Sequence, residues 1–335
     1  MREPRGAAAL GARGGAAAER LAALSVDLDE IGCYAAIHGL DVPWDDSAQA
    51  IYDRAVARFA ALFADEDVPA TFFAVGTDLD RAANGARLAE LHAAGHEIGN
   101  HSKSHLYDLT RRDAATIREE VAGGIAAIER ATGTAPVGFR APGYTITDTV
   151  FGVLDELGVA YDSSVFPCPA YFAAKAVAIG GIALRGRRSR SVIDDPRVLS
   201  APADPYMPGT PYWRRDRDQH DDGGGVVELP IGVTRTLTGR LPYIGTNVVL
   251  GGERVARLLT AGIVGRPLVN LELHGIDLAD ADEDGLGWLR PHQVDLRRTA
   301  REKEAALRAA IGALRKAGYR FVTLAEAASV YRARG

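Results

Sequence analysis

Residues 70–100, ATFFAVGTDLDRAANGARLAELHAAGHEIGN, contain the pattern that decides the fold. The stretch opens with ATFFAV at 70–75, a compact run of aromatic and β-branched residues that predicts a buried strand. Residues 88–94 predict a helix that ends at Gly95, and residues 97–99 are again strand-like. A strand, a helix and a second strand in this order predict a βαβ unit with a parallel pair of strands.

The same alternation continues on both sides of this unit. Asp113 and Gly133 mark the ends of a predicted helix over 113–131, because an acidic N-cap and a glycine beyond the last turn are common boundary residues. We therefore predict an α/β fold with a parallel sheet, whose working face is where the strands end. Further strands are predicted at 21–28, 137–140, 159–162, 267–273 and 321–324, and further helices at 48–64, 147–157, 253–263 and 297–317.

The domain organisation follows from where this alternation starts and breaks. Residues 1–20 are rich in Ala, Gly and Arg and are predicted to be a disordered or weakly helical leader. Residues 21–330 are predicted to form a single domain with a long insertion over about 165–247. The insertion holds many prolines and scattered aromatic residues, so it is either a solvated excursion or a lid that recognises substrate. Its basic cluster consists of Arg185, Arg187, Arg188 and Arg190.

The composition of the 335 residues excludes several classes of protein. Hydrophobic residues make up 47%, charged residues 25%, and the net charge is −5, so no global basic field indicates nucleic acid or anionic lipid. Cys33 and Cys168 fit neither a disulfide framework nor a zinc knuckle. We see no run of about 18 apolar residues and no signal-peptide core, so we predict no transmembrane helix and a cytoplasmic location.

Residues able to bind a metal and move protons follow three of the predicted strands. Asp27 and Asp29 close the first strand, where alternate side chains share a face. His101 and His105 follow the strand at 97–99, as a pair that can face one way on a helical turn, and His274 ends a later strand. One carboxylate and two histidines make a three-ligand metal site with an open position, the pattern of a catalytic site. The other carboxylate could accept a proton from water, and the third histidine could protonate a leaving amine.

Each of these features alone has a plainer interpretation. An acidic strand end is often exposed, a lone H-x-x-x-H pair is a weak pattern, and a histidine after a buried strand is often a hydrogen-bonded core residue. Their joint occurrence at successive strand ends favours a hydrolase site.

Five stretches together resemble the NodB-homology polysaccharide deacetylases, carbohydrate esterase family 4. Their order and spacing match the family over about residues 21–328. The resemblance implies a distorted (β/α) barrel of seven or eight strands and a hydrolase acting on carbon–nitrogen bonds other than peptide bonds. It also implies one divalent metal ion, zinc first, with cobalt or nickel as alternatives. The stretches are SVDLD (25–29), GHEIGNHSKSH (95–105), GFRAPGY (138–144), AYDSS (160–164) and NLELHG (270–275).

The resemblance also implies a role for each matching residue. Asp27 resembles the catalytic base, and Arg140, in the R-x-P motif, resembles the arginine that orients this base. His274 resembles the general acid. The implied metal ligands are Asp29, His101 and His105, and the residues expected near substrate or the oxyanion are Gly143 through its main-chain N–H, Tyr144, Asp162 and Glu272.

Three positions depart from the common pattern of the family. The first motif reads D-x-D instead of the adjacent D-D of many peptidoglycan and chitin deacetylases, and so resembles a branch with cytoplasmic-type deacetylases. Gly143 stands where many members have tyrosine, so one wall of the groove is expected to be more open. Glu272 stands where an apolar residue often precedes the final histidine. If it points inward it adds negative charge and could bind a substrate amine or hydroxyl; if it points outward it has no catalytic role.

We predict from these residues the removal of an N-acyl group, acetyl first, from an amino sugar or from a glycan or lipid-linked precursor. The alternatives are a deformylase of a lipid-linked amino sugar, a metal-free hydrolase of cyclic amides or allantoin, and a non-catalytic carbohydrate-binding module. The complete ligand set disfavours a metal-free hydrolase, and the intact base and acid disfavour a binding module. A glycosidase is disfavoured because Asp27 and Asp29 lie too close together to flank a glycosidic bond.

Overall fold

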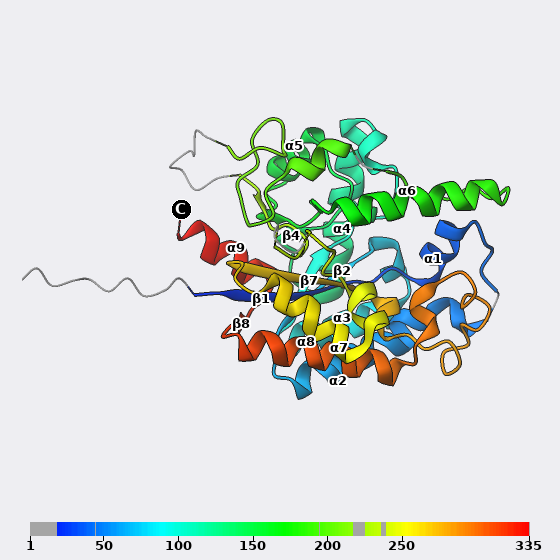
Figure 1. Cartoon of the computed structure of the whole chain (residues 1–335). Helices are drawn as coiled ribbons and strands as arrows, with labels where there is room; N and C mark the ends of the chain where they lie inside the picture. Colours follow the sequence, from blue (N-terminus) through cyan, green and yellow to red (C-terminus); the bar gives the residue numbers. More distant parts are fainter. Residues whose placement is uncertain (1–18, 44, 194, 217–224, 236–238, 335) are drawn as a thin grey trace, which may run out of the picture.

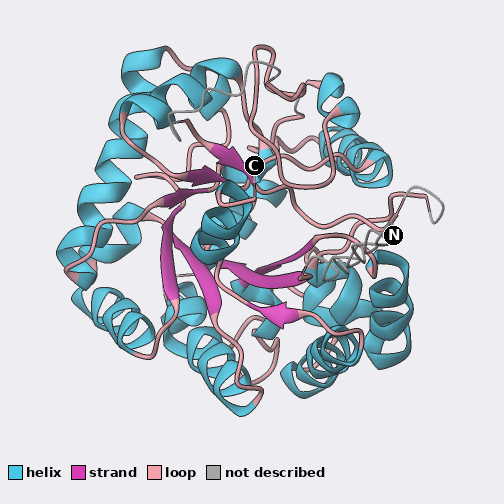
Figure 2. Cartoon of the chain, turned by 90° about the vertical axis from the view of Figure 1, so that its left-hand side faces the viewer, coloured by secondary structure: helices cyan, strands magenta, loops and turns pink. Residues whose placement is uncertain are grey.

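Eight parallel strands form a curved sheet in the part of the chain that the computed structural model describes, residues 19–43, 45–193, 195–216, 225–235 and 239–334. The strand order is β6-β5-β4-β3-β2-β1-β7, and β8 pairs with the start of β1. Figure 2 shows these strands as an incomplete ring inside a ring of helices, which confirms the predicted α/β barrel. The strands are β1 (Leu21–Asp27), β2 (Ala70–Ala74), β3 (Glu97–Asn100), β4 (Gly138–Phe139), β5 (Tyr161–Asp162), β6 (Val227–Glu228), β7 (Leu268–His274) and β8 (Arg320–Phe321).

Helices cover the outside of the sheet, and their ends follow the sequence signals. The Asp113 carboxylate accepts a hydrogen bond from the Thr116 N–H, and Gly133 ends the same helix with a φ of 75°, so both predicted caps are confirmed. The helices, labelled in Figure 1 where there is room, are α1 (Ile31–His38), α2 (Val56–Asp65), α3 (Ala82–Ala93), α4 (Ala114–Thr132), α5 (Asp148–Glu156), α6 (Pro169–Leu184), α7 (Gly245–Ile263), α8 (Ala300–Lys316) and α9 (Leu324–Arg332).

The side chains of β1 and β7 alternate between the helix-covered core and the interior of the barrel. In β7, Val269, Leu271 and Leu273 join the core beneath the helices. On the other face of β7, Asn270, Glu272 and His274 point into the barrel, because alternate residues of a strand share a face. The interior therefore changes from apolar at the start of the strands to polar and charged at their C-terminal ends.

The barrel is closed by the chain that follows β6. The Gly232 N–H donates to the Asn270 carbonyl oxygen at 2.9 Å, which joins this segment to β7. A Cβ at position 232 would overlap that same oxygen, so the close approach requires glycine.

The segment 165–247, predicted as one insertion, differs from that expectation. It contains the long helix α6 and also β6, which pairs with β5 and is thus part of the sheet. A strand of only two residues is too short to show alternation, which explains why the sequence pattern did not reveal it. Most of the predicted leader, residues 1–18, lies outside the described residues, and only Glu19 and Arg20 are described.

Candidate active site

Three strand ends bring five predicted residues together at the C-terminal mouth of the barrel. Asp27 ends β1, and Asp29 lies two residues beyond it. His101 and His105 belong to the loop after β3, and His274 ends β7. The Asp29 Oδ1 atom lies 3.2 Å from Nε2 of His101 and 3.2 Å from Nε2 of His105. All except His274 are buried, so these charged groups compensate one another within the protein.

The loop that carries the two histidines is not the helical turn that the sequence indicated. Ser102 and His105 have positive φ angles, 66° and 53°, and the Ser102 hydroxyl accepts the His105 N–H at 3.1 Å. Two left-handed residues, rather than a helical i, i+4 repeat, therefore turn both imidazoles toward Asp29.

This loop is fastened to helix α4 by its main chain and side chains. The Asn100 side-chain amide donates to the Val121 carbonyl at 2.9 Å. The Lys103 N–H donates to the Glu120 carbonyl at 2.8 Å, and the Glu120 carboxylate accepts from the N–H and hydroxyl of Ser104 at 2.8 and 2.6 Å. A Cβ at Gly124 would overlap the Asn100 side chain, so this close contact depends on the glycine. The loop is thereby held in one position against α4.

The set Asp29, His101 and His105 fits a metal ion. The ligand atoms of the three residues all lie within 4.8 Å of one another. Within the described residues, Asp29 Oδ1 and both ring nitrogens of His105 form no hydrogen bond although they are buried, which is costly unless another group binds them. The His101 Nδ1–H donates to the Arg140 carbonyl at 2.7 Å, which leaves Nε2 directed at Asp29. Three ligands with room for further ones are typical of a catalytic metal site.

The pKa shifts of this set indicate that the buried Asp29 carboxylate is stabilised by positive charge on its neighbours. Burial favours the neutral acid, yet His105 and His101 hold the pKa of Asp29 well below its usual range. Burial disfavours the imidazolium, yet Asp29 raises the pKa of His105 to about 10. Positive charge beside the buried carboxylate therefore stabilises it, and a divalent cation bound to the same atoms would also supply such charge.

Asp27 is held differently from Asp29. Its Oδ1 accepts from Nη1 of Arg140 at 2.7 Å, and its Oδ2 has no hydrogen bond within the described residues. Oδ2 lies 3.8 Å from His101 Nε2, beside the metal-binding set. Asp27 therefore has one fixed oxygen and one oxygen that is available for a proton.

Arg140 is completely buried and makes contacts across the barrel interior. Its Nε donates to the Ser163 carbonyl at 2.8 Å, and its Nη2 donates to the hydroxyls of Ser25 and Ser163, each at 2.9 Å. The guanidinium carbon lies 4.3 Å from the ring centroid of Phe73. Burial opposes the charge, but Asp27 and then Glu272 raise the pKa of Arg140, so it stays a cation behind Asp27.

His274 faces this group from β7 and has its own carboxylate partner. Glu272 is fully buried and points inward, and its Oε1 lies 2.9 Å from His274 Nδ1. The Tyr144 hydroxyl lies 3.3 Å from His274 Nε2. Burial opposes protonation, but Glu272 raises the pKa of His274 well above its usual value. The open question about Glu272 is therefore answered: it points inward and pairs with His274.

A second set, Asp27, Glu272 and His274, also has its ligand atoms within 4.8 Å of one another. This set is a poorer metal site, because Arg140 already binds Asp27 and Glu272 already pairs with His274.

Gly143 and Tyr144 line the same cavity, whereas Asp162 does not. Asp162 lies beneath the site, where its carboxylate accepts the N–H and hydroxyl of Ser164 at 2.9 and 2.7 Å. The Ser164 hydroxyl in turn accepts the N–H of Ala141, next to Arg140, at 2.8 Å. Asp162 therefore supports the loop of the R-x-P motif and does not face substrate.

The cavity at the mouth measures about 160 Å³ and includes residues that the sequence did not indicate. They come from loops, from short 3-10 turns and from helices α1, α6 and α7, and no motif distinguishes them. These residues are Tyr34, Ile37, Tyr107, Tyr171, Lys175, Ser191, Ile244, Thr246, Ile276, Gln293 and Asp295.

Comparison with known proteins relates part of this chain to a family. Residues 42–161 match the sequence profile described as polysaccharide deacetylase, a range that contains both histidines of the loop and Arg140. This part of the chain is therefore similar to the polysaccharide deacetylases. The chain is also 27% identical over 154 residues to a Helicobacter pylori protein named peptidoglycan deacetylase. That match covers 44% of this chain and 50% of the relative, so the chain spans about half the length of the curated relative that it matches.

A solved structure shares the fold of this chain. It is a Mycobacterium smegmatis protein provisionally named a polysaccharide deacetylase, with a TM-score of 0.53 and 20% sequence identity. The superposition covers 94% of this chain and 91% of the other. At this identity the likeness establishes the barrel fold, and the chemistry of the site depends on the residues described above.

Proposed function

We propose that this protein is a metal-dependent hydrolase that removes an N-acyl group, acetyl first, from an amino sugar of a glycan or a glycan precursor. One observation supports this proposal above the others. The set Asp29, His101 and His105, in which Asp29 Oδ1 and both His105 ring nitrogens lack a hydrogen bond within the described residues, lies beside Asp27, and His274 faces the same cavity. The similarity of residues 42–161 to polysaccharide deacetylases and the name of the Helicobacter pylori relative support an acylated sugar as substrate.

Asp29, His101 and His105 would hold one divalent cation, with zinc as the first candidate and cobalt or nickel as alternatives. Such an ion supplies two things when bound: it polarises the acyl carbonyl and lowers the pKa of water.

Asp27 acts as the general base in this proposal. Arg140 fixes one carboxylate oxygen at 2.7 Å, so the other oxygen faces the cavity and can take a proton from the attacking water. The buried guanidinium of Arg140 lies directly behind Asp27 and is its ion-pair partner.

His274 acts as the general acid. Glu272 keeps the imidazole protonated, and the Tyr144 hydroxyl lies beside Nε2. As the carbon–nitrogen bond breaks, His274 delivers its proton to the leaving nitrogen, so that an amine and a carboxylic acid are released. The main-chain N–H of Gly143, on the same wall as Tyr144, is the proposed donor to the oxyanion.

Metal analysis combined with an acid-release assay tests this proposal. We expect about one equivalent of zinc or a similar metal in the wild type. The double variant His101→Ala/His105→Ala should lose both the metal and the release of acetate or formate from N-acetyl and N-formyl amino sugars. The double variant His92→Ala/His292→Ala is the matched control, because it removes two histidines outside the metal set and should change neither.

The variant Asp27→Asn separates the base from the metal site. It should keep the metal and lose roughly 10²–10⁴-fold in kcat. A near wild-type rate in this variant would refute the role of Asp27. A wild-type protein that takes up no metal even after reconstitution would refute the metal-dependent mechanism.

A further inference from the structure

Helix α6 has an unusual surface for a helix on the outside of a protein. Of its sixteen residues, only Lys175 is charged, and none is fully buried. Val177 is 75% exposed and Leu184 is 91% exposed. A helix that is apolar all round is normally buried in a core or in lipid, so a helix in this exposed position needs a partner to cover it.

The first half of α6 is attached to the active site. The ring centroid of Tyr171 lies 4.7 Å from that of Phe166 and 5.8 Å from that of Tyr144. The Lys175 ammonium donates to the Gly143 carbonyl at 2.8 Å, and both Tyr171 and Lys175 line the cavity. The position of α6 relative to the cavity mouth is thus fixed.

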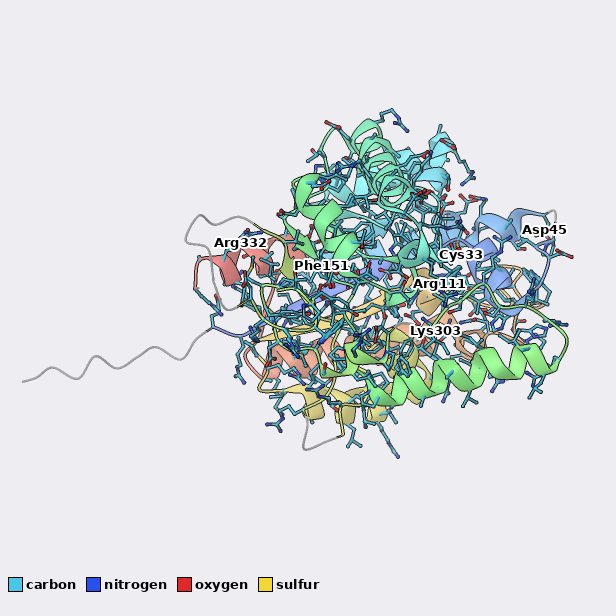
Figure 3. All side chains as sticks on the ribbon, turned by 90° about the horizontal axis from the view of Figure 1, so that it is seen from above. Cys33, Asp45, Arg111, Phe151, Lys303 and Arg332 are labelled. Carbon is cyan, nitrogen blue, oxygen red and sulfur yellow. The ribbon has the colours of Figure 1, made fainter. Side chains whose placement is uncertain are left out.

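The second half of α6 continues along the outer edge of the molecule. Figures 1 and 3 show it running outward, on the side where α1 follows the end of β1. Val177, Ala178 and Leu184 in this half, and Ala173 and Ala174 just before it, are all exposed and apolar.

A basic cluster directly follows this apolar surface. Arg185, Arg187, Arg188 and Arg190 are all exposed, and none forms an ion pair with any residue that the structure describes. Their segment lies against the end of α1, because the Arg190 N–H donates to the Ala36 carbonyl. The chain as a whole carries a net charge of −5, so this local positive surface stands apart from the rest of the molecule.

We propose that α6 and this arginine cluster bind the surface of an anionic phospholipid bilayer. The exposed apolar side chains would enter the boundary between headgroups and acyl chains, while the arginines contact the lipid phosphates. The helix is about 24 Å long, shorter than the hydrocarbon core. Among the described residues no helix is long and apolar enough to cross a membrane.

A bilayer can cover the apolar side chains of α6 and also contact the four arginines, whereas a second copy of the chain accounts only for the apolar side chains. Self-association through α6 would cover the apolar side chains, but the partner would present the same four arginines and no new anionic group. An anionic bilayer supplies hydrocarbon and phosphate side by side.

This orientation places the cavity mouth at the lipid surface. Because Tyr171 and Lys175 belong to the bound helix and line the cavity, a substrate carried on a lipid could enter without leaving the bilayer. This consequence for the substrate rests on the proposed function, whereas the binding of the bilayer does not.

Vesicle co-sedimentation of the full chain tests the proposal independently of enzyme activity. We expect the wild type to bind vesicles of equimolar phosphatidylcholine and phosphatidylglycerol, to release with added salt, and to bind pure phosphatidylcholine much more weakly. Each arginine near an anionic surface contributes roughly fivefold to partitioning, so Arg187→Gln/Arg188→Gln should weaken binding on the order of twentyfold. Val177→Asp/Leu184→Asp should reduce it to background.

Two matched controls complete the experiment. Arg254→Gln/Arg301→Gln removes the same charge from exposed positions on α7 and α8, and Leu258→Asp places an acid on another exposed leucine, 71% exposed on α7. Both should bind vesicles as the wild type does. Equal binding by all variants, or no binding by the wild type, would overturn the proposal. A concentration-dependent dimer that Val177→Asp/Leu184→Asp abolishes, without vesicle binding, would assign the surface to a second copy instead.

Discussion

The barrel has two halves that are held together in different ways. In the long-strand half, made of β1, β2, β3 and β7, the strands β1 and β7 pair through seven residues, from Leu21 opposite Leu268 to Asp27 opposite His274. In the short-strand half, made of β4, β5 and β6, each strand has only two residues. Long backbone ladders fix the first half. The second half has shorter ladders, which include the hydrogen bonds from the Ser163 N–H to the Phe139 carbonyl and from the Leu229 N–H to the Asp162 carbonyl, and side chains that cross the interior support it in addition.

This difference matters because the site draws on both halves. Asp27 and His274 are placed by the ladder between β1 and β7. Arg140, which positions Asp27, follows β4 and is held by Ser163 and Ser25. The comparison teaches that in this protein a buried polar network supplements the shorter backbone ladder, and that the orientation of Asp27 depends on this network.

The largest effect is expected from Arg140→Ala, which removes the centre of the side-chain network. The variant leaves Asp27 as a buried carboxylate without its cation, so the free energy of unfolding should fall by about 3–5 kcal/mol. The kcat of the remaining folded protein should fall on the order of 10–100-fold. Denaturant unfolding and steady-state kinetics measure the two losses.

Arg140→Lys keeps the positive charge but loses the planar set of N–H donors of the guanidinium. It should therefore restore the free energy of unfolding more fully than kcat. A stable and active Arg140→Ala protein would contradict the dependence of the base on the short-strand half.

Leu271→Ala probes the long-strand half without touching the site. Leu271 is fully buried on the face of β7 that packs under the helices. Truncation should lower the free energy of unfolding by about 2–5 kcal/mol. The kcat should stay unchanged below the unfolding transition, because seven paired residues fix the position of His274. A large fall in kcat in a folded Leu271→Ala protein would show that the pairing of β1 with β7 does not hold His274 in place when the core packing is disturbed.

The two neighbours of His274 come from different halves and should have different effects on pH dependence. Glu272 belongs to β7 and raises the pKa of His274, whereas Tyr144 follows β4. In the proposed mechanism His274 donates a proton, which it can do only below its pKa, so activity should be lost as the pH rises through that value. Glu272→Gln removes the negative charge, lowers the pKa and should move the alkaline fall of kcat to lower pH. Tyr144→Phe should leave that fall in place. Profiles of kcat against pH measure both, and an unshifted Glu272→Gln profile would contradict the pairing.

The smallest effect is expected from Asn270→Ala, which cuts one link between the halves. The Asn270 side-chain amide donates to the Ser163 hydroxyl at 2.9 Å and lies 3.2 Å from the Leu229 carbonyl. Its loss should lower the free energy of unfolding by about 1–3 kcal/mol. Hydrogen exchange should accelerate at β5 and β6 while β1 remains protected. Uniform acceleration in both halves would show that they unfold as one unit.

The same division decides how much could be predicted from the sequence. The long-strand half was predictable because runs such as 70–75 and 267–273 are long enough to show a strand, and its motifs stand where these strands end. The short-strand half gave weaker predictions. The strand β6 was not predicted within the expected insertion, because two residues are too few to show the alternating pattern of a strand.

Within the site, motif residues were predictable and their surroundings were not. The five residues at the mouth were expected there, and the structure brings them together. The helical turn expected for His101 and His105 was wrong, because Ser102 and His105 take positive φ angles that spacing cannot reveal. Asp162 was expected near substrate but supports Ser164 from below. Asp295 and Lys175 reach the cavity from segments far apart in the sequence, which no local pattern brings together.

The attachment of the histidine loop to α4 has a thermodynamic consequence. Four hydrogen bonds already hold residues 100–104 against the helix, so an incoming cation would order almost no additional backbone. Binding of the cation should therefore bury little new apolar surface, and the heat-capacity change of binding should be close to zero. In a zinc finger, by contrast, binding of the ion is coupled to folding of the domain. Because the contacts with α4 already order the loop before a cation binds, the protein could lose one ion and bind another without unfolding.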